Sequence, residues 1–268
     1  MMPWAVQLQL KHDDGVGSVT CGGTLITKKH VITAAHCFQK KFLITTKSRN
    51  PSRFCEKDSR YSNEEILRNL YARVGATCTK LNKDLGCTNR KQLGKFVNVK
   101  RFLMGPLFEN NCENGGDYFI AELAESIDNF DGANHACLPF FSNVTIPKKG
   151  SLDAFGWGSD PSRAYDNISY PMLQRITLDI MPFEECNENW YESLPPDAIC
   201  TVEEPEKNVC KGDSGGGLLY ALNNRFYLAA IVSYGTDCGK MLLGAEPKGQ
   251  INTDIRKYFK EILNFISF

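Results

Sequence analysis

The chain has 268 residues, of which 42% are hydrophobic and 23% charged, proportions that are ordinary for a soluble globular protein. Its 31 basic and 31 acidic side chains cancel to a formal net charge of zero, which argues against nucleic acid or an anionic membrane as a partner. No apolar run approaches the roughly 20 residues that span a bilayer, so we expect no membrane-spanning segment.

The first half of the chain contains short strands separated by polar turns. Residues 5–10 alternate polar and apolar side chains, as a half-buried strand does. Residues 47–64 are polar and irregular, and residues 64–70 are expected to form a short helix. The strands expected in this half are residues 5–10, 18–26, 31–33, 71–76 and 96–103.

The second half repeats the pattern of short apolar runs bounded by turn residues. These runs are residues 151–157, 173–181, 217–221, 226–234 and 249–253. The tail differs, because Thr253-Asp254 is a plausible N-cap and the apolar residues after it fall at helical spacing. The sequence therefore predicts an all-β core followed by a C-terminal helix over 254–266.

Eleven cysteines are many for a cytosolic protein and ordinary for a secreted one with disulfides. Two glycosylation sequons, at Asn143 and Asn167, agree with secretion. The start of the chain, MMPWAVQLQL, lacks the basic and apolar regions of a signal peptide. We therefore expect a secreted, extracellular protein whose N-terminal segment precedes this sequence, and the odd cysteine count fits a lost partner in that segment.

One serine carries the strongest chemical signal. Ser214 lies in the string Gly-Asp-Ser-Gly-Gly at residues 212–216, and a serine hydroxyl becomes a nucleophile when a histidine removes its proton. The string also fits the looser pattern of the α/β-hydrolases, which need their histidine after the serine. All 4 histidines precede Ser214, so that alternative fails on chain order.

Several strings together resemble one family. They are CGGTLI at 21–26, TAAHC at 33–37, GWG at 156–158, GDSGG at 212–216 and SYG at 233–235. In this order and at this spacing they are similar to the chymotrypsin-like (trypsin-fold, S1) serine proteases. The resemblance covers nearly the whole chain and implies two antiparallel six-stranded β-barrels with a C-terminal α-helix. The N-terminal barrel would occupy residues 1–126 and the C-terminal barrel residues 127–268 of one peptidase domain. His36 and Asp117 lie farther apart in sequence than is usual in the family, which implies that residues 39–70 are an inserted surface loop.

The resemblance assigns catalytic roles. It implies that Ser214 attacks the scissile carbonyl, that His36 takes the serine proton and returns it to the leaving amine, and that Asp117 orients the imidazole. The backbone N–H groups of Gly212 and Ser214 would form the oxyanion hole. The reaction needs no metal and no organic cofactor.

The catalytic aspartate has two rivals. Asp117 opens the segment DYFIAEL, which resembles the family's aspartate followed by a short apolar run, although Tyr118 and Phe119 are bulkier than usual. Asp128 and Asp131 lie in a turn-like stretch after that run, so we prefer Asp117.

Substrate preference is expected to depend on the residue six positions before the nucleophile. In trypsin this position is an aspartate that pairs with Lys or Arg at P1, the substrate residue whose carbonyl is cleaved. Here it is Asn208, with Val209 beside it. A neutral amide lacks the charge-assisted bond that holds a buried guanidinium, so we predict against a basic P1 residue.

The segment Ser233-Tyr234-Gly235 resembles the strand edge that pairs with the substrate backbone, and Ser233 resembles the serine that supports the buried aspartate. Gly235 matches a pocket-wall glycine, which favours an open pocket entrance. Either Gly249 or Gln250 could form the back wall of this pocket.

The cysteines fit the same family pattern. The resemblance implies the disulfides Cys21–Cys37, Cys186–Cys200 and Cys210–Cys238. Cys78–Cys87 is a plausible local bridge and Cys55–Cys112 a weaker one. Cys137 resembles the cysteine that in many members bonds a propeptide. A zinc site is disfavoured because the sequence has no C-x₂-C pair and the cysteines indicate an oxidising compartment.

The N-terminus needed for activation is the feature in which this sequence departs from the family pattern. In the family, cleavage releases an N-terminus of the type Ile/Val-Val-Gly-Gly, whose ammonium pairs with the aspartate before the nucleophile, here Asp213. Without that partner we expect the loop to rearrange and the oxyanion hole to be poorly formed. The alternative function is therefore a catalytically silent homologue that binds rather than cuts, although intact His36, Asp117 and Ser214 argue against it.

The expected partners follow from the preferred function. They are a protein or peptide substrate, an activating protease and a protein inhibitor. The protein is expected to be a monomer without nucleic acid, membrane or metal.

Overall fold

The alternation of residues 5–11 places Val6, Leu8 and Leu10 on the buried face of strand β1 (Ala5–Lys11). In the computed structural model, the described residues are 2–12, 18–40, 60–141, 144–160, 171–190 and 193–267. Strand β1 pairs antiparallel with both β2 and β4, and the strand order β1-β2-β3-β6-β5-β4 closes a barrel. Its other strands are β2 (Ser18–Leu25), β3 (His30–Thr33), β4 (Leu70–Val74), β5 (Lys95–Met104) and β6 (Phe119–Leu123).

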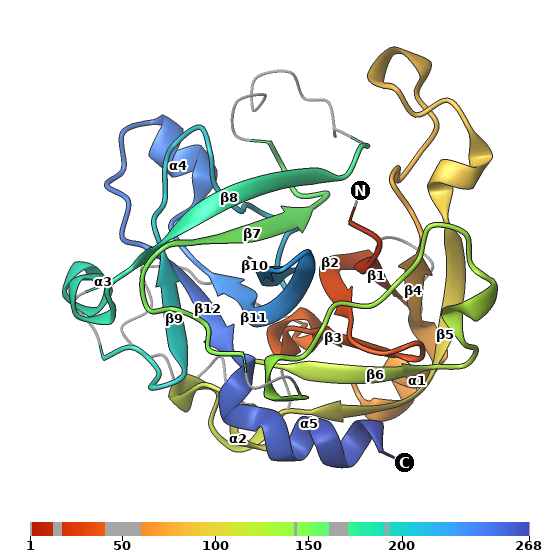
Figure 1. Cartoon of the computed structure of the whole chain (residues 1–268), viewed down its shortest axis with the longest axis horizontal. Helices are drawn as coiled ribbons and strands as arrows, with labels where there is room; N and C mark the ends of the chain where they lie inside the picture. The colour runs from red at the N-terminus through yellow and green to blue at the C-terminus, as the bar shows by residue number, and fades with distance from the viewer. Residues whose placement is uncertain are drawn as a thin grey trace.

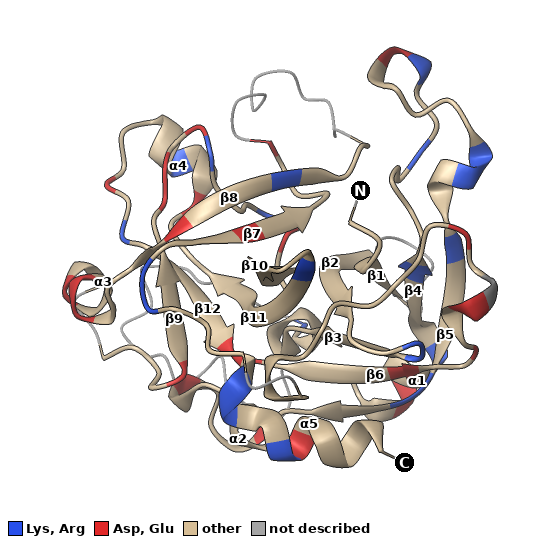
Figure 2. Cartoon of the chain, in the orientation of Figure 1, with Lys and Arg blue, Asp and Glu red and all other residues tan. Residues whose placement is uncertain are grey.

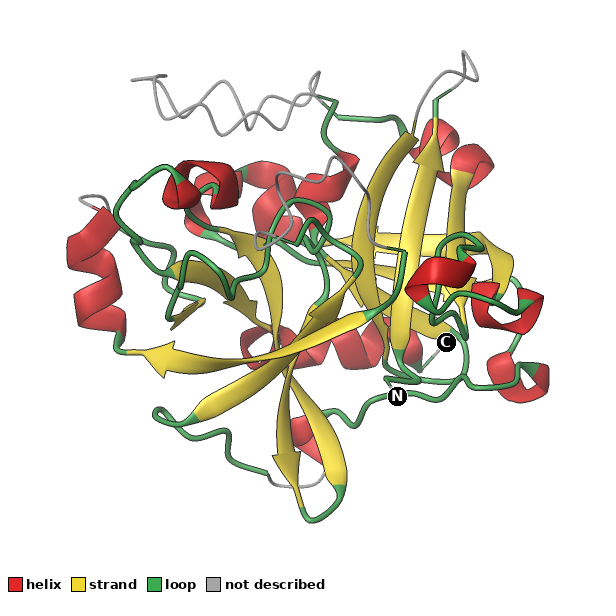
Figure 3. Ribbon diagram, turned by 90° about the horizontal axis from the view of Figure 1, so that it is seen from above, coloured by secondary structure: helices red, strands yellow, loops and turns green. Residues whose placement is uncertain are grey.

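A second closed barrel follows, with the strand order β10-β11-β12-β9-β8-β7. Its strands are β7 (Ser151–Gly156), β8 (Gln174–Met181), β9 (Ala198–Thr201), β10 (Gly217–Leu222), β11 (Arg225–Tyr234) and β12 (Gln250–Asp254). The two barrels lie side by side (Figures 1 and 3). In Figure 1 the first barrel is coloured red to yellow-green and the second green to blue. The predicted all-β fold of two six-stranded antiparallel barrels is confirmed.

Helices lie at the edges of the barrels. They are α1 (Asn63–Asn69), α2 (Pro106–Asn110), α3 (Phe183–Trp190), α4 (Cys238–Leu242) and α5 (Phe259–Ile266). Helix α1 begins with a capping box between Ser62 and Glu65. Helix α5 follows a 3₁₀ turn over Ile255–Tyr258, so the predicted C-terminal helix is present and its regular α part begins later than the pattern suggested.

Among the described residues, the largest of three hydrophobic clusters extends from the first barrel into the second. It contains the apolar side chains of the first barrel together with Phe155, Leu219 and Leu228 of the second. Trp4 also packs against Phe226 in a tilted arrangement, with 4.9 Å between ring centroids. This shared core fixes the relative position of the loops that meet between the barrels, and those loops carry the candidate site.

Basic and acidic residues are interspersed along the strands, helices and loops of both barrels (Figure 2). Among the residues described, no helix is both long and apolar enough to cross a membrane.

Candidate active site

His36 lies in a 3₁₀ turn over Ala35–Phe38 that directly follows strand β3. The disulfide Cys21–Cys37 ties this turn to strand β2. Strand β3 pairs with β6, and β6 begins just after Asp117, so sheet pairing brings the two segments together. The imidazole is 5% exposed, which places it in a desolvated but reachable position.

Asp117 is bound to His36 through both carboxylate oxygens. Its Oδ2 lies 2.7 Å from His36 Nδ1, and its Oδ1 accepts the backbone N–H of His36 at 2.8 Å. The hydroxyl of Ser233, near the end of β11, donates to the same Oδ2 at 2.5 Å. Burial alone would raise the pKa of Asp117, but the interactions with His36 and Ser233 outweigh it and hold the pKa below its usual value. The carboxylate therefore remains ionised beside the imidazole.

The loop before Asp117 is held by a residue that the sequence did not indicate. Asp197 is buried, and its Oδ2 accepts the N–H of Gly116 at 2.9 Å and the hydroxyl of Tyr258 at 2.6 Å. An isolated aspartate before a short strand gives no pattern that marks such a role. This contact ties the segment that carries Asp117 to the second barrel.

The loop that carries Ser214 packs against the histidine turn. The carbonyl of Ser214 accepts the N–H of Gly22 at 2.7 Å and lies 4.0 Å from Cys37 Sγ. The next residue, Gly215, has a φ of +80°, and a Cβ there would lie 2.0 Å from Thr33 Oγ1. Only glycine allows this approach, so the glycine of the motif brings the backbone of Ser214 against the segment that leads to His36.

The two backbone N–H groups expected to form the oxyanion hole, those of Gly212 and Ser214, are available to bind an oxyanion. Gly212 has a φ of +104° and lies against Gly158, because a Cβ on Gly212 would be 3.0 Å from Gly158 Cα. Within the described part of the chain, the N–H groups of Gly212 and Ser214 donate to no protein acceptor. Two such free donors on one turn can bind an anionic oxygen.

Asp213 is buried, and its carboxylate accepts hydrogen bonds from two backbone N–H groups. Its Oδ1 accepts the N–H of Gly158 at 2.8 Å and its Oδ2 accepts the N–H of Cys210 at 3.0 Å. The described residues supply it with no cationic partner. Contrary to the rearrangement expected without an ammonium partner, the carboxylate stays buried in this structure, because two N–H groups replace part of its hydration.

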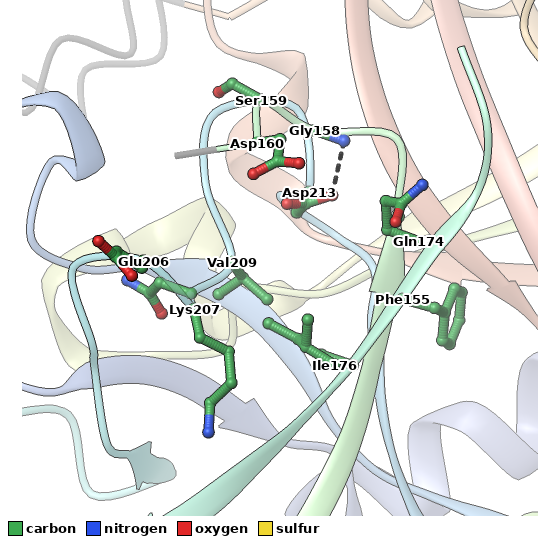
Figure 4. A pocket seen from close by; sticks show the side chains of 13 residues that line it. Phe155, Gly158, Ser159, Asp160, Gln174, Ile176, Glu206, Lys207, Val209 and Asp213 are labelled. Carbon is green, nitrogen blue, oxygen red and sulfur yellow. Dashed lines mark hydrogen bonds between the residues drawn. The ribbon is translucent and has the colours of Figure 1, made fainter. Parts of the chain in front are cut away.

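A pocket of about 220 Å³ opens beside Asp213 (Figure 4). Its walls combine the apolar side chains of Ile176 and Val209 with the acidic side chains of Asp160 and Glu206. Val209, which was expected to help select the substrate, therefore lines this pocket beside Asp213.

We expect Asp213→Asn to change how stability depends on pH. Burial, opposed by the hydrogen bonds from Cys210 and Gly158, raises the pKa of Asp213 from 3.8 to about 6. Between these two values the unfolded chain is ionised while the folded chain holds a proton, so stability falls as pH rises. A shift of this size corresponds to about 3 kcal/mol.

The variant lacks this titration. Urea denaturation at pH 4 and pH 7.5 should therefore show the unfolding free energy of the wild type, relative to Asp213→Asn, decreasing by about 2.4 kcal/mol as pH rises, because the unfolded carboxyl is already about half ionised at pH 4. Each protein serves as the other's reference, because all other titrating groups are shared. An equal difference at the two pH values would contradict the raised pKa.

The rival aspartates lie outside the site. Asp128 is half-exposed and pairs with Lys28 at 2.6 Å, and Asp131 is exposed in a turn. Asp117, by contrast, contacts His36 through both of its carboxylate oxygens.

The residues expected to select substrate meet where β9 and β11 end and β12 begins. Asn208 is buried, and its Nδ2 lies 3.4 Å from Oε1 of Glu203, a buried carboxylate that the sequence did not single out. Tyr234 packs edge-on against Trp190 at 5.5 Å between centroids. Cys210–Cys238 links the two sides of this region.

The described disulfides are Cys21–Cys37, Cys78–Cys87, Cys186–Cys200 and Cys210–Cys238. Cys137 is half-buried and free. The predictions for Cys55 and for the sequon residues Asn143 and Asn167 lie outside the described residues.

Comparison with known proteins agrees with the fold. The sequence model of the trypsin family matches residues 1–66 and 76–247. The chain is 47% identical over 273 residues to trypsin-like protease try-5 of Caenorhabditis elegans, a match that covers 100% of the chain and 84% of that protein. It is 27% identical to spermosin of Halocynthia roretzi, over 83% of the chain and 49% of that protein. It is 24% identical to phenoloxidase-activating factor 1 of Holotrichia diomphalia, over 88% of the chain and 60% of that protein.

Proposed function

Because the chain belongs to the trypsin family of serine proteases, we propose that it is a secreted endopeptidase that forms an acyl-enzyme on Ser214. The observation that carries the proposal is the hydrogen-bonded chain from Ser233 through Asp117 to His36, with the backbone of Ser214 packed against the histidine turn. The proposed triad would lie where residues 1–126 and 127–268 meet.

Each group has one task in this mechanism. His36 accepts the proton of Ser214 as the hydroxyl attacks the peptide carbonyl, and then delivers it to the leaving amine. Asp117 keeps the proton of His36 on Nδ1, so Nε2 is the free base, and stabilises the imidazolium that forms. A water molecule that gives its proton to His36 then attacks the acyl-enzyme, and the acyl group is released from Ser214.

The developing oxyanion would be bound by the N–H groups of Gly212 and Ser214. Each such donor typically contributes about 3–4 kcal/mol to the transition state. Because these amides have no protein acceptor in the described residues, they require no rearrangement to bind the oxyanion.

Activation would act through Asp213. The pocket beside its carboxylate is lined by apolar side chains, by Asp160 and Glu206, and by Lys207, whose ammonium end extends away from Asp213 (Figure 4). The apolar and acidic members of this lining suit an incoming aliphatic N-terminus with its ammonium. An ammonium there would remove the cost of a buried unpaired carboxylate. This supports activation by an upstream cleavage, performed by a separate protease.

The proposed partners are a protein or peptide substrate, an activating protease and a protein inhibitor. The proposal gives the protein a monomeric, extracellular state, and the disulfides favour the extracellular part of it. Because Asn208 is neutral, a basic residue at P1 is not expected.

The test is the burst of an activated ester. The protein, cleaved ahead of Met1, should release one equivalent of nitrophenol per chain from 4-nitrophenyl acetate before steady turnover, with the acetyl group mapped to Ser214 by mass spectrometry. The absence of both a burst and peptide hydrolysis after correct cleavage would favour the silent binding homologue. An acetyl group on another residue would contradict the assigned nucleophile.

A further inference from the structure

The space beside Gly235 is already occupied. Gly235 follows strand β11 at the edge expected to bind substrate, and a side chain at this position would begin with its Cβ. A Cβ on Gly235 would lie 2.1 Å from Gln250 Oε1 and 2.4 Å from Glu203 Oε1. The end groups of two long side chains therefore fill the volume that an open entrance at Gly235 would have left for substrate.

Glu203 is fixed in place by backbone. Its Oε1 accepts the N–H of Thr236 at 2.7 Å, and its Oε2 accepts the N–H groups of Lys248 and Gly249, both at 3.1 Å. The side chain of Asn208 adds a longer contact at 3.4 Å. This buried carboxylate joins three separate segments, so it cannot leave without exposing several N–H groups.

Gln250 is held less firmly. Its backbone is paired with Thr201 in β9, but its side chain is held by a long hydrogen bond of 3.3 Å from Nε2 to the carbonyl of Ile251. The side chain is 3% exposed, so it is buried against Gly235 and Glu203. The neighbouring Gly249 is directed elsewhere, because a Cβ there would meet Met181 Sδ at 2.8 Å. Of the two candidates for the back wall, Gln250 is the one that reaches the pocket.

The floor of the expected P1 pocket, formed by Asn208 and Glu203, presents mainly hydrogen-bond acceptors. A carboxylate accepts only, so Asn208 must turn its NH₂ group toward Glu203 and its Oδ1 away. That Oδ1 is buried and has no partner among the described residues. The floor beneath Gln250 thus combines a fixed negative charge with an unpaired oxygen.

We propose that Gln250 fills the P1 pocket beneath Gly235 and restricts P1 to short side chains, and that Glu203 beneath it would bind a cation if Gln250 were shortened. This inference rests on the proposed peptidase function, whose P1 class it specifies. Gly, Ala and Ser at P1 end before they reach the Gln250 carboxamide. Lys, Arg and Phe at P1 would have to displace a buried side chain.

The first measurement is a P1 profile of the activated wild type. We expect kcat/KM for P1 Ala to exceed that for P1 Lys or P1 Phe by about 100-fold, the upper range for steric selection in a pocket. Cleavage after Lys or Phe at rates equal to Ala would overturn the inference.

The second measurement removes the blocking side chain. In Gln250→Ala, kcat/KM for P1 Lys should rise at least about 10-fold and exceed that for P1 norleucine, which has similar length and no charge. This pair of substrates detects the Glu203 carboxylate without altering Glu203, whose replacement would endanger folding. A gain that is equal for Lys and norleucine would contradict the role of Glu203, and no gain would contradict the role of Gln250.

Gln7→Ala is the matched control. Gln7 lies in strand β1, in the first barrel, and its replacement removes the same atoms from a strand. It should leave the P1 profile unchanged. If Gln7→Ala changed the profile as Gln250→Ala does, the effect would be a general loss of strand stability and the inference would fail.

A binding arm separates this inference from the proposed function. The fluorescent cation 4-aminobenzamidine should bind Gln250→Ala at least about 10-fold more tightly than the wild type, and this needs no catalysis. Tighter binding in a protein without an ester burst would support the pocket and reject the peptidase function. An ester burst with equal probe affinity in both proteins would reject the pocket and retain the function.

Discussion

Ser214→Ala is expected to lower kcat for peptide hydrolysis by about 10⁶-fold, the loss seen when the nucleophile of such a triad is removed. The methyl group of alanine cannot form the acyl-enzyme, and only the oxyanion amides and substrate binding remain to accelerate attack by water. KM should change little, because Ser214 contributes no long side chain to binding. The measurement is steady-state hydrolysis of a P1 Ala peptide by the activated variant.

Ser151→Ala is the control for this variant. Ser151 is an exposed serine at the start of β7 and bonds to Asp179, away from His36. Its replacement should leave kcat within about twofold of the wild type. A Ser214→Ala protein that keeps more than a hundredth of the wild-type rate would show that the nucleophile is another group.

Asp117→Asn is expected to lower kcat/KM by about 10⁴-fold at neutral pH. An amide at this position can donate to Nδ1 of His36, which favours the tautomer whose proton lies on Nε2 and faces the serine. That tautomer cannot accept the serine proton. The fold should persist, because the amide keeps the shape of the carboxylate and one acceptor for the His36 backbone N–H.

The matched control is Asp128→Asn. Asp128 is the rival aspartate of the same region and pairs with Lys28 at the surface. Exposed pairs contribute about 0–1 kcal/mol to stability, so this variant should hydrolyse peptide at the wild-type rate. If Asp128→Asn lost activity and Asp117→Asn kept it, the assignment of the orienting carboxylate would be wrong.

The strands could be predicted where one face is buried and the other is not. Strand β1 alternates, and its pattern gave bounds close to those observed. All five residues of β6 are buried, so that strand has no alternation, and β9 is a four-residue strand without a distinct pattern. Helix α3 was missed because it is short and mostly polar, with one fully buried residue, Cys186. Such elements depend on tertiary contacts that single-sequence periodicity does not contain.

Some residues of the candidate site could likewise be predicted from the sequence, and others could not. His36 and Ser214 stand in strings whose neighbours are dictated by close backbone approach, as Gly215 against Thr33 shows, so the residues around them carry a signal. Glu203 stands in the acidic stretch 203–206, which has the composition of a solvated loop. Its partners are backbone N–H groups of distant segments, and any residue type supplies these. No sequence pattern could have indicated it or the contact between Gln250 and Gly235.

The central claim is that Ser214, His36 and Asp117 act as one unit, and combining two of the variants tests it most directly. Residues that act together show losses that do not add. The account predicts that Ser214→Ala/Asp117→Asn hydrolyses peptide within about threefold of the rate of Ser214→Ala alone. A further loss approaching the 10⁴-fold effect of Asp117→Asn would mean that the carboxylate acts independently of the serine, and would contradict the account.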